Sequence, residues 1–111
     1  MQLDKILSGI KIISISGNKK LHIEDISFDS RNVTKNSMFV AVKGSKTDGH
    51  DYIENAIKAG ASAIVCETVP VNPDKKICWI KTDDSAKALG QAASNFFGNP
   101  SSSLKLVGVT G

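Results

Sequence analysis

The sequence predicts a single α/β domain built on one mixed sheet, with its strands flanked by two main helices. Three observations predict it. Apolar runs of strand length recur along the chain, two longer stretches have helical periodicity, and the two kinds of segment alternate. From residue 37 onward the predicted order is strand, helix, strand, strand, helix, strand. A length of 111 residues fits one domain, which we assign to residues 1–111.

The first part of the chain predicts short elements. "LDKILSGI" (3–10) carries apolar residues at helical spacing, which indicates a short opening helix. "KIISISG" (11–17) alternates and predicts a strand. "LHIEDISFD" (21–29) also alternates, but its phase slips near Glu24 and Asp25, which predicts either a bulge or two short strands.

The middle of the chain predicts a buried strand, a helix and a second buried strand. "SMFVAVKG" (37–44) is a continuous apolar run, which is typical of a central strand covered on both faces. "HDYIENAIKAGA" (50–61) has helical periodicity, and Gly60 is expected to end that helix. "SAIVCE" (62–67) is the next predicted strand.

The last part predicts a strand, the longest helix and a final strand. "ICWIK" (77–81) follows a loop marked by two prolines, and "LKLVGVTG" (104–111) closes the chain. "DDSAKALGQAASNFFG" (83–98) predicts the helix, with Asp83 or Asp84 as its N-cap. Trp79 is expected in the core. The apolar side of the long helix is expected to consist of Ala86, Leu89, Ala93, Phe96 and Phe97.

Composition excludes several function classes. The formal charge is +3 and the basic residues are spread along the chain, so we predict no nucleic-acid partner, although a mild positive charge helps to attract an anion. Cys66 and Cys78 lie in apolar runs and are interpreted as buried thiols in a cytosolic protein, without a metal site. No apolar stretch approaches the length of a membrane span, and no signal peptide is recognisable.

The first candidate for chemistry is "FDSRNV" (28–33), where a strand runs out into a loop. Arg31 offers a rigid fork for phosphate or carboxylate, and the Ser30 hydroxyl can donate and accept. The alternative is a structural turn in which Asp29 caps the loop and pairs with Arg31. From these residues alone the turn is the better interpretation.

The second candidate is "VKGSKTDGH" (42–50), a polar loop between a buried strand and a helix. Gly44 and Gly49 allow a ligand to approach the backbone, and free N–H groups before a helix favour an anion. The loop lacks the spacing of a Walker A motif, so Lys43 and Lys46 are not phosphate-loop lysines. A ligand loop and a plain connection are equally supported here. His22 and His50 are interpreted as capping or surface residues.

Taken together, the stretch from Phe28 to Glu67 resembles one family closely. The order is Asp-Ser-Arg, a Met-Phe-Val-Ala strand, the motif "DGHDYI" and then "AIKAGA". This order resembles the N-terminal domain of the Mur ligases, the cytoplasmic enzymes of peptidoglycan precursor synthesis. The resemblance extends from about Leu21 to Gly111 and implies the mixed-sheet fold of that domain.

Within the family, "DGHD" at 48–51 and the ending "LVGVTG" most resemble the ligase that adds the third stem-peptide residue, diaminopimelate or lysine. In such enzymes this ending continues into a phosphate loop, and Gly111 would be that loop's first, ATP-binding glycine. We therefore expect the chain to stop where a central ATPase domain begins. Alternatives are the ligase acting at the next step, and a non-catalytic α/β interaction module.

The resemblance also implies site residues. The domain is expected to bind the UDP part of a UDP-MurNAc-peptide, while the central and C-terminal domains of the parent chain bring ATP with Mg²⁺ and the amino acid. The residues implied to contact substrate are Phe28, Ser30, Ser45, Lys46 and Thr47, supported by Asp29, Arg31, Gly44, Asp48, Gly49 and His50. The chain itself is expected to bind no cofactor and to hold no catalytic residue, whereas the parent is an ATP-dependent amide ligase.

Overall fold

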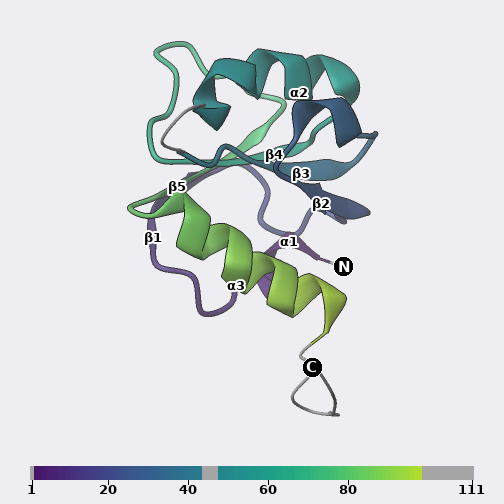
Figure 1. The fold of residues 1–111 in the computed structure, drawn as a ribbon, viewed down its shortest axis with the longest axis vertical. Coiled ribbons are helices and arrows are strands. Elements are labelled where there is room, and N and C mark those ends of the chain that lie inside the picture. Colours follow the sequence, from purple (N-terminus) through teal and green to yellow (C-terminus); the bar gives the residue numbers. More distant parts are fainter. Residues whose placement is uncertain (1, 44–47, 99–111) are drawn as a thin grey trace.

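A computed structural model describes residues 2–43 and 48–98. One five-stranded sheet has the order β1-β5-β4-β3-β2, with helices on both faces (Figure 1). The strands are β1 (Ile12–Ser16), β2 (Asp25–Ser27), β3 (Ser37–Val40), β4 (Ala63–Cys66) and β5 (Cys78–Thr82). The helices are α1 (Leu3–Ile6), α2 (Ile53–Ala59) and α3 (Ser85–Phe97), with 3₁₀ turns η1 (Ser30–Asn32) and η2 (Gly49–Tyr52).

Strand direction determines where polar groups gather. β2, β3, β4 and β5 run parallel to one another, and β1, at one edge, runs antiparallel to β5. The carboxyl ends of the four parallel strands therefore lie along the same edge of the sheet. In open sheets of this kind, ligands bind beyond the carboxyl ends of the strands.

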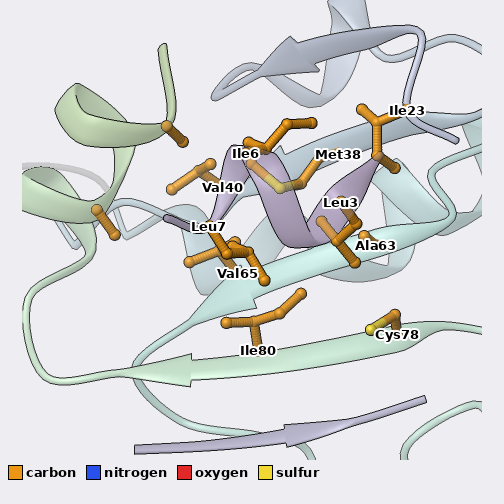
Figure 2. Packing of buried hydrophobic residues seen from close by; sticks show 12 residues of the cluster. Leu3, Ile6, Leu7, Ile23, Met38, Val40, Ala63, Val65, Cys78 and Ile80 are labelled. Atoms are coloured by element: carbon orange, nitrogen blue, oxygen red, sulfur yellow. The ribbon is translucent and has the colours of Figure 1, made fainter. Parts of the chain in front are cut away.

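The two faces of the sheet carry separate halves of the core. Met38 and Val40 of β3 face α1 and α3, whereas Phe39 between them faces α2. Figure 2 shows the first half, in which Leu3 and Ile6 of α1 meet side chains from the strands. All four residues of β3 are buried. The prediction of a central strand covered on both faces is confirmed.

The longest helix, α3, is confirmed in extent, but the residues of its apolar side were predicted only in part. Asp84 caps it, since its carboxylate accepts the N–H of Lys87 at 3.1 Å. Its buried residues are Ser85, Ala88 and Ala92. Phe97 is 68% exposed, and Ala86 is exposed too, so their assignment to the core was wrong. Leu89 and Phe96 are partly buried and pack against the core as predicted, and Ala93 is partly buried too. The packed side thus combines these residues with the small side chains of Ser85, Ala88 and Ala92.

The predictions for α2 and for the buried Trp and Cys residues are confirmed, whereas segment 21–29 differs from its prediction in part. α2 ends at Gly60, which has a φ of 118°. Trp79 is buried, and both cysteines are free and buried, with burial raising the pKa of the Cys66 thiol to about 11. Segment 21–29 forms one strand and an isolated bridge between Gln2 and His22, and the register irregularity lies in β1 instead. The strand predicted at 104–111 lies outside the described residues.

We predict that Ile64→Ala destabilises the fold by about 2–5 kcal/mol, because it leaves a cavity between β4 and α2. Ile64 is fully buried, whereas Ile13 is 55% exposed on the edge strand β1. The matched Ile13→Ala should therefore cost about 1 kcal/mol or less. Urea unfolding of both variants measures the difference, and equal losses would contradict the assigned core.

Candidate functional site

A pocket of about 720 Å³ opens at the carboxyl edge, between the end of β2 and the start of α2. Its lining consists of Phe28, Asp29, Ser30, Arg31, Val42, Gly49, Tyr52 and Asn55. The two stretches singled out in the sequence thus meet at one pocket. Of the predicted site residues, Gly44, Ser45, Lys46 and Thr47 lie outside the described residues, as does Gly111. Val42 and Gly49, on either side of that gap, both line the pocket.

The first wall is the turn that follows β2. The Asp29 carboxylate caps η1 by accepting the Arg31 N–H at 2.9 Å. It also accepts from the Arg31 guanidinium, at 3.1 Å from Nε and 2.8 Å from Nη2. These bonds hold the pKa of the Asp29 carboxyl below its usual value. The turn predicted from the sequence is present, and it is one wall of the pocket.

Two aromatic side chains border the pocket in exposed positions. Phe28 is 65% exposed and Tyr52 is 40% exposed. An exposed Phe loses the benefit of burial, so its position at a pocket is a feature to be explained. A flat, partly apolar ligand would cover these rings.

The second wall is the segment that follows β3 and resumes before α2. The Gly49 N–H donates to the Val42 carbonyl at 2.8 Å. A Cβ at Gly49 would lie 2.7 Å from the Val42 nitrogen, a distance at which the backbone would have to move. Glycine is therefore required for this close approach.

His50 ties this second wall to β4. Its Nε2 accepts the N–H of Glu67 at 2.9 Å and that of Thr68 at 3.3 Å, so Nδ1 carries the proton and donates to the Asp48 carboxylate. Asp48 also accepts the His50 N–H, and these bonds lower the pKa of its carboxyl. His50 is thus a structural residue of the loop, in line with its interpretation as a capping residue.

A second link involves residues that the sequence analysis did not single out. The Glu67 carboxylate accepts the N–H of Ser85 at 3.0 Å and its hydroxyl at 2.7 Å, at the start of α3. Ser85 Oγ accepts the N–H of Lys43 at 3.0 Å. These bonds lower the pKa of the Glu67 carboxyl. The residues are 18 and 42 positions apart, so no local sequence pattern could connect them.

Residues 2–43 and 48–98 contain no group of three or more His, Cys, Asp or Glu side chains that could hold a metal ion. None of the helices in these ranges is both long enough and apolar enough to cross a membrane.

Comparison with known proteins identifies the family. A family model described as "Mur ligase family, catalytic domain" matches residues 22–97, more than half of the chain. This chain belongs to the Mur ligase family. The match includes both walls of the pocket, and the sheet with its flanking helices agrees with the N-terminal domain of Mur ligases, as the sequence predicted.

Curated relatives are similar over the whole chain. Three of them are UDP-N-acetylmuramoyl-L-alanyl-D-glutamate–2,6-diaminopimelate ligases, the enzymes called MurE. The identity is 45% for Bacteroides fragilis, 48% for Cytophaga hutchinsonii and 46% for Clostridium tetani. All of this chain is covered in each case, but only 23% of the relative. The chain thus spans about a quarter of the length of these Mur ligases.

Solved structures of Mur ligases share the fold. MurF from Thermotoga maritima, in complex with ADP, is 36% identical with a TM-score of 0.55, over 68% of this chain and 17% of that one. MurF from Acinetobacter baumannii is 26% identical with a TM-score of 0.57, over 66% of this chain and 15% of that one. These likenesses support the same domain type.

We predict that Glu67→Gln makes the free energy of unfolding depend less on pH in the acid range. The folded-state pKa of Glu67 is lowered, so its stabilisation is present above the ordinary glutamate pKa of about 4.3 and is lost as the pH falls through the lower folded value. The variant should be less stable than wild type at pH 7. Its free energy of unfolding should also fall less than that of wild type on acidification.

Urea unfolding between about pH 7 and pH 3 measures this. Glu54→Gln, at an exposed carboxylate on α2, is the matched control and should keep the wild-type profile. Parallel profiles for wild type and Glu67→Gln would contradict the assignment.

Proposed function

We propose that this domain binds the UDP moiety of UDP-MurNAc-L-Ala-D-Glu for a MurE-type ligase. The observation that carries the proposal is that the Phe28–Arg31 turn, Val42 and Gly49 line the same pocket. The parent enzyme would add diaminopimelate or lysine as the third residue of the peptidoglycan stem peptide, in the cytoplasm. The names of the relatives support this substrate, since they are ligases of UDP-N-acetylmuramoyl-L-alanyl-D-glutamate.

The chemistry of the pocket suits a nucleoside diphosphate. Uracil is flat, and Phe28 offers an exposed ring on which it can stack, with Tyr52 also on the border. The diphosphate needs donors, which the Ser30 hydroxyl, backbone N–H groups and the predicted contacts of Ser45, Lys46 and Thr47 would supply. A formal charge of +3 favours a dianion. Because the remaining substrate would contact other domains, we expect weak binding by this chain alone.

The reaction of the parent would be an ATP-dependent amide ligation. The D-glutamyl carboxylate would be phosphorylated, and the incoming amine would displace phosphate through a tetrahedral intermediate. The described residues include no metal-binding cluster, so no step through Mg²⁺ is assigned to them. The central and C-terminal domains of the parent chain are the proposed partners, and Gly111 remains the predicted start of the phosphate loop.

A MurF-type parent is the second candidate. The solved structures named above are MurF enzymes, but their identity to this chain is 36% and 26% over about two thirds of it. The MurE relatives reach 45–48% over all of it. We therefore favour MurE. Tighter binding of the UDP-MurNAc-dipeptide than of the tripeptide by the full-length parent would distinguish the two.

We predict that UDP shifts the amide signals near Ser30 and in residues 44–49 in a nitrogen-15 NMR titration. Phe28→Ala should weaken binding by about tenfold, because stacking on the base is lost. Phe97→Ala is the matched control, since Phe97 is equally exposed but lies at the far end of α3.

Unchanged spectra at about 1 mM UDP would overturn the proposal and favour an interaction module without a ligand. Equal weakening by Phe28→Ala and Phe97→Ala would place the binding site elsewhere.

We also predict that the purified chain neither hydrolyses ATP nor ligates amino acids, because the phosphate loop and the incoming-amine site would belong to other domains. Phosphate release measured over hours with Mg²⁺ and ATP should equal the buffer blank. Turnover that copurifies with the chain and disappears on its unfolding would contradict this.

A further inference from the structure

Just beyond β3, a backbone N–H donates to a side chain and not to the neighbouring strand. The Ala41 N–H donates to the Val65 carbonyl at 2.8 Å, as in the parallel ladder between β3 and β4. If the ladder continued, the next N–H on that side, that of Lys43, would donate to Glu67. It donates instead to Ser85 Oγ at 3.0 Å. The chain thus leaves the β3–β4 ladder at a point where its N–H bonds the start of α3.

Ser85 is fully buried, and both of its hydroxyl functions are used. It accepts from Lys43 and donates to the Glu67 carboxylate at 2.7 Å. The carboxylate lies at the N-terminus of α3, where it also accepts the Ser85 N–H and where the helix dipole favours negative charge. A charged acceptor makes this bond stronger than one between neutral groups.

Glu67 also holds the other side of the same wall. Its N–H donates to His50 Nε2 at 2.9 Å, and His50 is bonded to Asp48. Lys43 and Asp48 are joined by an isolated antiparallel bridge, next to the bond from Gly49 to Val42. One residue at the end of β4 thus fixes the chain where it leaves β3 and where it enters η2.

We propose that Glu67 and Ser85 are positioning residues for the ligand pocket, acting through the Ser85–Lys43 hydrogen bond on the wall formed by Val42 and Gly49. Neither residue lines the pocket, but each is one hydrogen-bonded step from the wall. A loop contact displaced by a fraction of an ångström loses much of its binding energy. The proposal rests on the proposed function, because the ligand used to test it is UDP.

The test is the UDP affinity of the 111-residue chain by NMR titration, at a temperature where each variant gives the spectrum of a folded protein. Ser85→Ala should weaken UDP binding by about three- to tenfold and should speed hydrogen exchange at the Lys43 and Gly49 amides before ligand is added. Ser62→Ala is the matched control, because it removes a buried hydroxyl that has no hydrogen-bond partner among the described residues. It should bind UDP within about twofold of wild type.

A second pair of variants covers the case in which Ser85→Ala does not fold. Glu67→Gln retains an acceptor oxygen, whereas Glu67→Ala does not. The affinity for UDP should fall in the order wild type, Glu67→Gln, Glu67→Ala, a partial rescue that a general loss of stability would not produce among fully folded variants.

The outcomes separate the two proposals. Wild-type affinity in folded Ser85→Ala, or in both Glu67 variants, overturns the positioning role and leaves the UDP site standing. A wild-type chain that does not bind UDP overturns the proposed function, and the positioning role with it. Weakened binding together with faster exchange at Lys43 and Gly49 supports the proposal.

Discussion

The parallel pairing of β2, β3, β4 and β5 is the constraint on which the rest of the structure depends. It places the carboxyl ends of four strands along one edge, so that the segments leaving them share a small region of surface. β3 and β4 are buried throughout, with apolar clusters on both faces, so the polar groups in this part of the sheet gather at the strand ends. The edge therefore collects nearly all the polar interactions described above, and the pocket forms between two of its loops.

Those interactions support the described residues of both loops at several points. Asp29 and Arg31 fix the turn after β2 through an exposed ion pair, whose energy in water is small. The wall after β3 has stronger support, because Ser85 is buried and bonded on both sides. A buried group left without its partner costs more than a surface pair gains. The two walls thus differ in how firmly the fold holds them.

The arrangement also accounts for the exposed aromatic residues. Phe28 follows β2 directly, where the strand runs out into the turn, and its side chain is exposed beside the pocket. Tyr52 precedes α2 and lies on the same pocket. If the domain binds UDP as proposed, both rings are available to the ligand. Phe97 is equally exposed but lies at the end of α3, away from the pocket lining, and has no comparable explanation within the described residues.

The sequence by itself determined the order of strands and helices, the burial of β3 on both faces and the two loops of the site, because periodicity and local motifs depend on neighbours along the chain. It predicted the packing of Leu89 and Phe96 in α3, but not that Ala88 and Ala92 are buried while Phe97 is exposed, since Ala and Ser fit against a sheet as well as Leu or Phe do. Nor could it connect Glu67 with Ser85 and Lys43, which lie far apart in sequence. Only the tertiary structure decided those contacts, because the strand order β5-β4-β3 brings the start of α3 beside the end of β3.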